Sequence, residues 1–330
     1  MSLRTFDAGG EAMAAFWPRS GPVVVMGDGR ILRPDPAGGT LSPTAVHDGG
    51  ILCADLGPDG ETVLSGGDDG RLAATASDGS TRTLADFGGR WVDQVAASPV
   101  SGLIACSAGR KAWVFDRKGA RTHAFDHPSS VGGLGFDAKG KRLAVAHYDG
   151  VSLWWAGDAG SQARVLTWKG SHIGVVFSPD GRFVVSTMQE NALHGWRLAD
   201  GADMRMAGYG AKVRSLAWAG KGRLLATSGA ARAILWPFQT RDGPMGRPPV
   251  ELGMAGALVT RVAATTRGDR VAAGDAEGAV MVCDVASTMP VTSVPGDGSR
   301  VVALAFSPDG RALVCATEAG RIGLADVAGD

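Results

Sequence analysis

Residues 304–327 read LAFSPDGRALVCATEAGRIGLADV, a stretch in which short apolar runs alternate with turn residues. The apolar runs cover residues 302–306, 312–317 and 322–327, and their lengths are typical of β-strands. In the first turn, Pro308 fixes φ near the value that a turn needs, and Gly310 can adopt a positive φ near its end. The stretch therefore predicts three consecutive strands joined by tight turns.

The same pattern occurs along the whole chain. Residues 54–77 (ADLGPDGETVLSGGDDGRLAATAS) and 175–198 (VVFSPDGRFVVSTMQENALHGWRL) match it closely. Looser copies begin at Ala14, Val95, Leu134, Leu216 and Val262. Equivalent positions in the third strands follow one another at intervals of 40 to 47 residues: Leu32, Ala74, Val114, Trp154, Trp196, Trp236, Cys283 and Ala325. Eight copies with a period of about 41 residues indicate a repeat architecture.

A fourth short strand is expected between successive copies. The segments that could form it are residues 82–87, 121–125, 163–167, 204–207, 250–253 and 291–294. Four short strands in a period of about 41 residues fit one blade of a β-propeller. The sequence therefore predicts an all-β fold of four-stranded blades.

With these residues in view, the chain resembles the WD-repeat (WD40) β-propeller family over essentially its whole length. The family pattern is Gly-His, an apolar strand, Ser-Pro-Asp-Gly, a strand with Ser or Thr, an Asp in the next turn, and Trp-Asp. The resemblance implies structural hydrogen-bonding roles for these residues: His47, Ser65 and Asp69 in the second copy, His127, Asp149 and Trp155 in the fourth, and Ser186 and Trp196 in the fifth. Because Thr75, Val145 and Glu190 depart from the pattern, we expect partial networks and a large share for apolar packing.

The resemblance also implies how the fold closes. We expect residues 1–330 to form a single closed β-propeller of eight blades, or of seven if residues 13–34 do not form a blade of their own. The final copy lacks a fourth strand after residues 322–327, whereas residues 3–7 form an unused strand at the start of the chain. Pairing of these two segments would complete the last blade and remove an exposed sheet edge.

Composition limits the classes of function. Lys plus Arg and Asp plus Glu are 33 each, which argues against a generally basic nucleic-acid binder, and 45% hydrophobic residues suffice for a large core. We expect the four cysteines to be buried and reduced, because none forms a Cys-x-x-Cys pair. No signal sequence or membrane-spanning segment is evident, so we expect a cytoplasmic, monomeric protein, and the excess of Arg (26) over Lys (7) suggests a bacterial source.

The resemblance places partner binding on the propeller rim. In this family, partners dock on the face formed by the loops before the inner strands and by the turns between second and third strands. The candidate partner-binding residues at those positions are Arg90, Trp91, Tyr148, Lys212 and Arg300, followed by Asp68, Gln189 and Glu318. Arg, Trp and Tyr dominate interface energetics, and the basic residues suggest an acidic peptide or a phosphate group as the ligand. We therefore expect a non-enzymatic scaffold for a protein or peptide partner.

An enzymatic alternative stays open at this point. A metal-dependent hydrolase or lactonase-like propeller would need carboxylates or histidines that converge at the mouth of the channel. The sequence contains no Gly-x-Ser-x-Gly motif, no P-loop and no helical His pair with zinc spacing, so we expect no catalytic residue, cofactor or metal site. A proline-rich insertion, residues 237–249, is either a connector or a docking loop.

Overall fold

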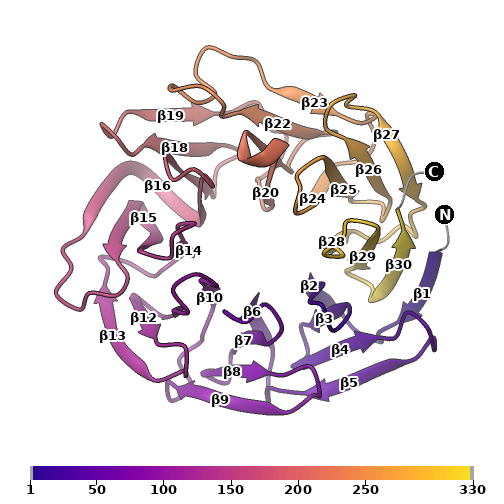
Figure 1. Ribbon diagram of the computed structural model, residues 1–330, viewed down its shortest axis with the longest axis horizontal. Coiled ribbons are helices and arrows are strands. Elements are labelled where there is room, and N and C mark those ends of the chain that lie inside the picture. The colour runs from indigo at the N-terminus through magenta and orange to yellow at the C-terminus, as the bar shows by residue number, and fades with distance from the viewer. Residues whose placement is uncertain (1–2, 328–330) are drawn as a thin grey trace. The chain divides into compact units, whose positions relative to one another are not determined.

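The computed structural model describes residues 3–327, and β-strands dominate it (Figure 1). Within that range the one helix is the short 3-10 element η1 (Gly220–Gly222), and no helix there is long and apolar enough to cross a membrane. Every strand pair in the described range is antiparallel, and the pairing groups the strands into seven sheets. The expectation of an all-β fold is therefore confirmed.

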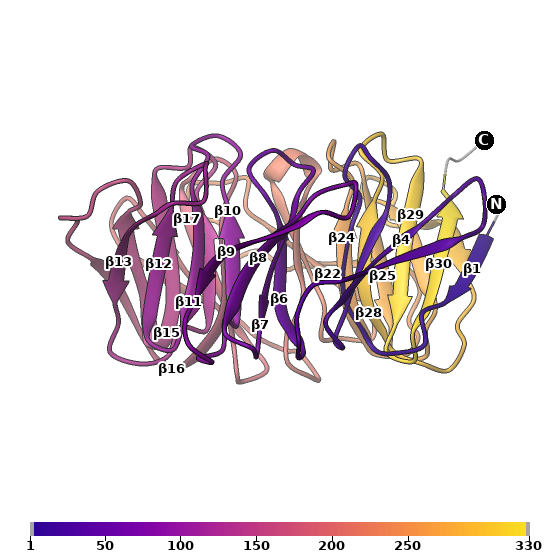
Figure 2. The ribbon, with the colours of Figure 1, turned by 90° about the horizontal axis from the view of Figure 1, so that it is seen from below.

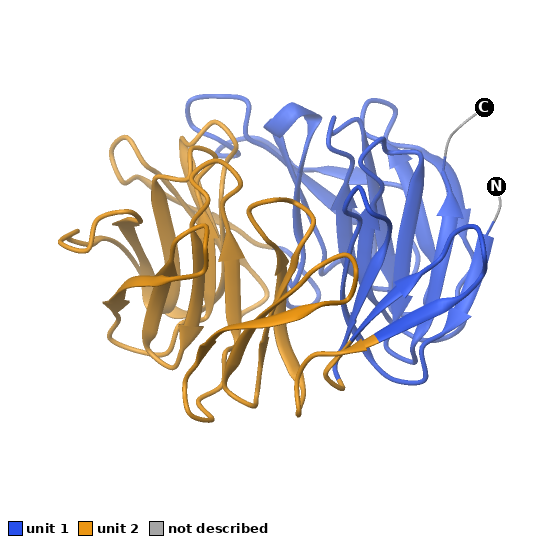
Figure 3. Cartoon of the chain, turned by 60° about the horizontal axis from the view of Figure 1, so that its bottom comes forward, with its two compact units in different colours: residues 1–27, 31–43, 208–330 blue, residues 28–30, 44–207 orange. Residues whose placement is uncertain are grey.

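The chain divides into two compact units (Figure 3). Unit 1 contains residues 1–27, 31–43 and 208–330, and unit 2 contains residues 28–30 and 44–207. Each unit is described by itself below.

Unit 2 contains two four-stranded sheets and one six-stranded sheet. The first sheet consists of β6 (Ile51–Leu56), β7 (Val63–Gly67), β8 (Arg71–Thr75) and β9 (Thr81–Asp86). The second consists of β10 (Gln94–Ala97), β11 (Ile104–Ala108), β12 (Lys111–Phe115) and β13 (Arg121–Asp126). The third consists of β14 (Gly133–Phe136), β15 (Arg142–Trp155), β16 (Arg164–Phe177), β17 (Phe183–Met188), β18 (Leu193–Arg197) and β19 (Asp203–Met206).

Unit 1 contains three complete four-stranded sheets and most of a fourth. The fourth is formed by β2 (Ala12–Phe16), β3 (Val23–Met26), β4 (Arg30–Pro34) and β5 (Leu41–Ala45). The next two are formed by β20 (Leu216–Ala219), β21 (Leu224–Thr227), β22 (Ala233–Pro237) and β23 (Val250–Leu252), and by β24 (Val259–Ala264), β25 (Arg270–Asp275), β26 (Val280–Asp284) and β27 (Pro290–Val294). The last is formed by β28 (Val301–Phe306), β29 (Ala312–Thr317), β30 (Arg321–Asp326) and β1 (Leu3–Asp7).

The expectation of eight separate blades is corrected to seven sheets. The uncertain first copy does form its own sheet, β2 to β5, so the difference arises elsewhere. The copies that begin at Leu134 and Val175 share the six-stranded sheet, because β16 pairs with β15 over its first half and with β17 from His172 onward. The backbone passes from one copy to the next at Gly170, where φ is +113°, without a break in the strand.

Burial explains why the strands read differently in the sequence. All residues of β3, β7, β11 and β17 are buried, as expected for strands whose two faces are both covered. These strands read as continuous runs of apolar or small residues. The fourth strand of each copy is more exposed, and β27 alternates between exposed and half-buried residues before its buried end. This contrast explains why the fully buried second strands are easy to recognise in the sequence and the fourth strands are harder to recognise.

The Ser-Pro-Asp-Gly turn is closed by its own side chains. Ser307 donates its hydroxyl hydrogen to Asp309 at 2.6 Å and accepts a hydrogen bond from the Ala312 amide at 2.9 Å. The Gly310 amide donates to the Ser307 carbonyl at 2.8 Å, and φ at Gly310 is +72°. The turn therefore joins two strands with its hydrogen-bonding groups satisfied, as the residue types predicted.

The chain's first strand pairs with its last (Figures 1 and 2). Residues Leu3 to Asp7 oppose Ala325 to Arg321 in antiparallel register, and the Ala8 amide donates to the Gly320 carbonyl at 2.9 Å. A Cβ atom on Gly320, where φ is +89°, would collide with the Gly10 carbonyl oxygen, so only glycine fits there. The pairing joins the two ends of the chain within unit 1.

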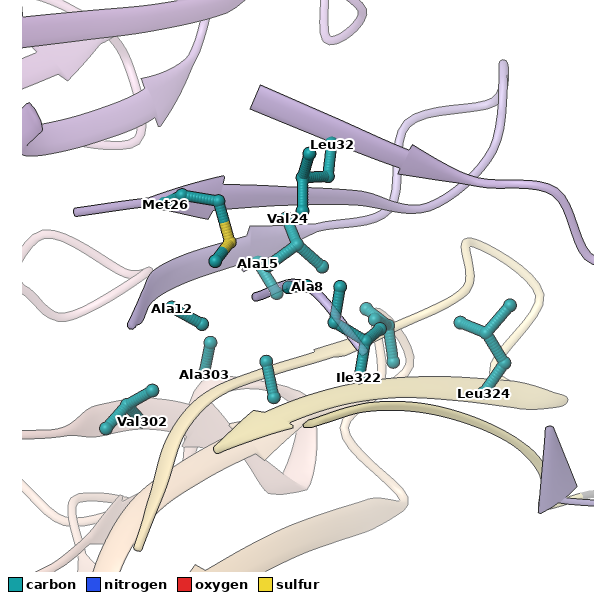
Figure 4. Close-up of a cluster of buried hydrophobic side chains, with 12 residues drawn as sticks. Ala8, Ala12, Ala15, Val24, Met26, Leu32, Val302, Ala303, Ile322 and Leu324 are labelled. Atoms are coloured by element: carbon teal, nitrogen blue, oxygen red, sulfur yellow. The ribbon is translucent and has the colours of Figure 1, made fainter. Parts of the chain in front are cut away.

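A buried apolar cluster supports this junction (Figure 4). Its members come from β2 to β4, from β28 to β30 and, with Ala8, from the connection between β1 and β2; Phe6 of β1 packs against it. They are Ala8, Ala12, Ala15, Val24, Met26, Leu32, Val302, Ala303, Val314, Ala316, Ile322 and Leu324. The many alanines allow the two sheets to approach closely, so strand pairing and side-chain packing stabilise the same region.

Candidate functional site

The second repeat contains the complete His–Ser–Asp part of the expected network. His47 Nδ1 lies 3.0 Å from an Asp69 carboxylate oxygen, and His47 Nε2 lies 2.9 Å from the Ser65 hydroxyl. Burial alone would raise the pKa of Asp69, but hydrogen bonds from His47 and Arg71 outweigh burial and lower that pKa to about 2. The hydrogen bonds of these residues join the loop before β6 to the turn between β7 and β8, which is a structural role.

In the fourth repeat the expectation for Trp155 is wrong. The indole N–H that donates to His127 Nε2, at 3.0 Å, belongs to Trp154, which also stacks on Phe125. Trp155 is 57% exposed and lines a cavity of about 400 Å³ that includes Lys139 and Lys141. The two tryptophans are consecutive, so they point to opposite faces of β15, and the pleat decides which one reaches the histidine.

Asp149 also lies outside the network of the fourth repeat. Its carboxylate accepts a hydrogen bond from the Gly170 amide at 3.0 Å, and its φ of +65° places it in the tight turn within β15. His127 instead bonds to the Arg110 carbonyl, and burial lowers the pKa of His127 to about 4. Asp149 is therefore a turn residue.

In the fifth repeat Ser186 pairs with a histidine that the sequence left as a core or channel residue. His172 Nδ1 lies 2.7 Å from the Ser186 hydroxyl, and His172 Nε2 lies 2.9 Å from the Trp168 carbonyl. Trp196 is buried, and its ring lies 5.7 Å from the His172 ring. Both nitrogens of His172 have partners, so this histidine is structural.

The sixth repeat contains a network that the sequence analysis missed. The Tyr209 hydroxyl accepts a hydrogen bond from Trp236 Nε1 at 2.5 Å and lies 2.8 Å from the Thr227 hydroxyl. Thr227 in turn donates to the Ile234 carbonyl at 3.2 Å. Tyr209 thus takes the place that histidine holds in the second repeat. The signal available in the sequence was a Thr and a Trp at the family spacing without a preceding His.

Five of the predicted partner-binding residues lie in unit 2, and we call them the unit 2 loop group: Asp68, Arg90, Trp91, Tyr148 and Gln189. Trp91 and Tyr148 are 63% and 57% exposed. Three amide hydrogen bonds hold these segments in place. The Val92 amide donates to the Gly67 carbonyl, the Tyr148 amide to the Ser129 hydroxyl, and the Gln189 amide to the Ser171 carbonyl in β16. The group is therefore held on short connections at one end of the sheets.

The other three predicted residues, Lys212, Arg300 and Glu318, lie in unit 1. Lys212 and Arg300 hold equivalent places, since each directly precedes a fully buried valine. The Arg300 guanidinium donates to the Glu318 carboxylate at 2.5 Å, and the Glu318 amide donates to the Arg300 carbonyl. The structure therefore brings Arg300 and Glu318 together as an ion pair.

Two further arginines lie beside this pair, and the sequence analysis missed both. Arg261, on β24, donates from Nε to the Val302 carbonyl at 2.6 Å, which places it against the strand that follows Arg300. Arg214 precedes Ser215, whose hydroxyl exchanges hydrogen bonds with the Val262 backbone. Burial lowers the pKa of Arg261, and the positive charges of Arg214 and Arg300 lower it further. We call Lys212, Arg214, Arg261 and Arg300 the unit 1 basic group.

Comparisons with known proteins agree with these networks. Residues 40–83, which run from the loop before β5 into β9 and include His47, Ser65 and Asp69, match the family model "WD domain, G-beta repeat". Residues 40–83 therefore resemble a WD40 repeat. No curated protein sequence matches it.

Two solved structures resemble the fold of this chain over 97% of its length. The computationally designed Ika8 protein is 20% identical, with a TM-score of 0.79 over 97% of both chains. A chain of a structure described as the Mitotic Checkpoint Complex is 17% identical, with a TM-score of 0.62 over 97% of this chain and 90% of that one. These likenesses show the fold, a β-propeller of antiparallel four-stranded blades.

Other candidate groups in this chain are dispersed. Among residues 3–327, no three His, Cys, Asp or Glu side chains converge as metal ligands would. Burial raises the pKa of Asp55 to about 6, although the Leu56 and Ala97 amides donate to its carboxylate at 2.8 Å and 3.1 Å. The four cysteines are buried and free, which confirms that expectation. Asp55 therefore joins two neighbouring inner strands, and none of its partners within residues 3–327 is a second carboxylate.

Proposed function

We propose that this protein is a WD40-repeat propeller and a non-enzymatic scaffold that binds a protein or peptide partner through the loops before the inner strands and the turns between second and third strands. The exposed side chains of Trp91 and Tyr148 are the single observation on which the proposal rests most. Backbone hydrogen bonds hold Trp91 in a loop and Tyr148 at the turn within β15, so these exposed aromatic side chains lose little conformational freedom when a partner covers them.

The residues around Trp91 support the same proposal. Arg90 is exposed beside it, and Asp68 lies in the turn that the Val92 amide ties to this loop. An exposed aromatic ring next to an arginine combines two of the residue types that are enriched in protein interfaces. The unit 2 loop group is therefore the partner-binding surface that we propose.

Affinity capture from the native organism tests this function. The tagged wild-type chain, the double variant Arg90→Ala/Trp91→Ala and the control Trp155→Ala are compared by quantitative mass spectrometry. Trp155 is a matched control because it is also an exposed tryptophan of unit 2, next to the turn at the other end of its sheet, where the Ala156 amide bonds to Lys141. We expect the double variant to recover at least tenfold less of a partner protein than the wild type does, and the Trp155→Ala control to recover as much as the wild type. Equal recovery by all three proteins would contradict the proposal.

We also propose that the eight sequence copies act as eight blades and that β1 completes the last one. The six-stranded sheet supports this count because its two 14-residue strands each contain the segments of two blade positions. A cytoplasmic location and a monomeric state stay predictions. The metal-dependent hydrolase also stays open, and the metal experiment in the Discussion tests it.

A further inference from the structure

The unit 1 basic group contains a half-buried cation that no carboxylate neutralises. Arg261 donates from Nε to the Val302 carbonyl at 2.6 Å and from Nη1 to the Thr260 carbonyl at 3.1 Å. No Asp or Glu in residues 3–327 pairs with Arg261 or with Arg214. Removing a guanidinium from water is costly unless an anion compensates for it, so proteins nearly always pair such groups.

Three consecutive inner strands bring the arginines together. Arg214 precedes β20, Arg261 lies near the start of β24, and Arg300 precedes β28. The Ser215 hydroxyl bonds to the Val262 backbone at 3.0 Å and 3.1 Å, and the Arg261 guanidinium bonds to Val302. Each arginine therefore lies at, or within two residues of, a hydrogen bond that links its own strand to the neighbouring inner strand. The effect of Arg214 and Arg300 on the pKa of Arg261 is consistent with this proximity.

The net charge of the three arginines indicates which kind of anion they would bind best. Arg214, Arg261 and Arg300 carry three positive charges, and Glu318 offsets one of them through its ion pair with Arg300. The remainder matches a phosphoryl group, which carries about two negative charges at neutral pH, better than it matches a single carboxylate. Guanidinium groups also suit phosphate oxygens because their N–H donors form a planar fork.

We propose that Arg214, Arg261 and Arg300 bind a phosphoryl group. The inference rests on the proposed scaffold function and narrows its ligand to a phosphorylated partner or to free phosphate. Arg261 is the central ligand because its backbone hydrogen bonds fix the guanidinium in place and leave Nη2 without a partner among the described residues. Arg214 and Arg300 supply charge from the two neighbouring strands.

Isothermal titration calorimetry on the full chain tests this inference with four probes: inorganic phosphate, sodium acetate, acetyl-Gly-phosphoSer-Gly-amide and the same tripeptide with unmodified serine. We expect saturable binding of phosphate and of the phosphorylated tripeptide, and at least tenfold weaker binding of acetate and of the unmodified tripeptide. Tighter binding of the phosphorylated tripeptide than of phosphate would identify a phosphorylated partner, and the reverse order would identify free phosphate. Either order supports the site. No saturable phosphate or phosphotripeptide binding, or equal binding of acetate, would overturn it.

Variants locate the site. Arg261→Met keeps the apolar part of the side chain and should weaken phosphate binding at least tenfold, whereas Arg261→Lys should retain part of it. Arg214→Gln and Arg300→Gln should each weaken binding threefold or more, and they provide the test if Arg261→Met does not fold. Lys141→Gln, in the cavity beside Trp155, and Arg247→Gln, exposed in unit 1, serve as controls. Unchanged binding in the arginine variants, or a loss in Lys141→Gln, would overturn the assignment.

The result is separable from the test of the scaffold function. That test changes Arg90 and Trp91 in unit 2, whereas this one changes residues of unit 1. Partner capture that survives without phosphate binding would refute the phosphoryl site alone. Phosphate binding that survives while the Arg90→Ala/Trp91→Ala variant captures every partner would refute the unit 2 surface alone.

Discussion

Single residues in this chain show where family position predicts a contact and where it does not. His47, Ser65 and Asp69 form the network that their positions imply, with separations of 2.9 to 3.0 Å. In the fourth repeat the same reasoning chose Trp155, whereas Trp154 makes the bond. Alignment by motif is uncertain by one residue, and in a strand one residue reverses the face to which a side chain points.

The network around Tyr209 gives a prediction for stability. Tyr209→Phe removes the hydroxyl that accepts from Trp236 and bonds to Thr227, which leaves a buried indole N–H unsatisfied. We expect the free energy of unfolding to fall by about 1 to 3 kcal/mol, measured by urea denaturation. Tyr148→Phe, at an exposed position, serves as the control and should change it by less than about 0.5 kcal/mol. A Tyr209→Phe variant as stable as wild type would contradict the network's role.

Asp55 gives a prediction for pH dependence. Burial raises its pKa from 3.8 to about 6, so between these values the folded chain binds more protons at this site than the unfolded chain. The contribution of Asp55 to the free energy of unfolding should therefore fall as pH rises from about 4 to 6, by at most about 3 kcal/mol, and level off above that.

Urea denaturation at a series of pH values measures this contribution. The side chain of Asp55→Asn cannot ionise. This variant should therefore lack the fall in the free energy of unfolding between about pH 4 and 6 that Asp55 causes, even if its stability at a single pH differs from that of the wild type. Glu277→Gln, an exposed carboxylate variant, should keep the wild-type slope. A wild-type slope in Asp55→Asn would show that Asp55 does not hold its proton more tightly in the folded chain.

Among the elements, β1 depends on a partner distant in the sequence. It pairs with β30 through five residues, and Leu3 and Phe6 contact buried clusters on that sheet. The need for this strand could be predicted from the count of strands, because the last copy lacked a fourth one. The shared sheet of β14 to β19 could not be predicted from the sequence. Turn residues such as Asp149 and Gly170 usually mark the ends of strands, whereas β15 and β16 continue past them.

Deletion of residues 3–7 should destabilise the protein. The deletion exposes the edge of β30 and removes apolar contacts, so we expect the Tm to fall by at least about 5 °C in differential scanning fluorimetry. Phe6→Ala should produce part of this loss, whereas Thr5→Ala, whose side chain is exposed, should leave the Tm nearly unchanged. A deletion variant that melts at the wild-type temperature would show that β1 contributes little to stability.

At the scale of the molecule, the repeat period predicted the fold, and the site was predicted only in part. The period works because each copy reproduces the same turns and the same fully buried second strand. The exposure of Trp91 follows from its place in a loop, and that of Tyr148 from its place beside the turn within β15. Arg214 and Arg261 were missed because they lie in or next to apolar strand runs, and their proximity arises from strands one repeat apart, which a linear sequence does not display.

Metal removal tests the whole molecule. Because no three His, Cys, Asp or Glu side chains converge within residues 3–327, we expect incubation with EDTA to shift the Tm by less than about 1 °C. Elemental analysis of the purified protein should find zinc and calcium below stoichiometric amounts. A fall of several degrees with the chelator, reversed by one metal, would favour the metal-dependent hydrolase over the scaffold.

The uninterrupted run of β16 has a consequence for how such a chain can be rebuilt. Most copies are joined by connections that could be cut and religated with the neighbouring sheets left whole. The two copies that share β16 are joined by one strand that continues through Gly170, so removing either would sever a strand that the other needs. In gene duplication or in engineered arrays, these two copies should move as a pair, and a break introduced at residue 170 should be tolerated less well than one between other copies.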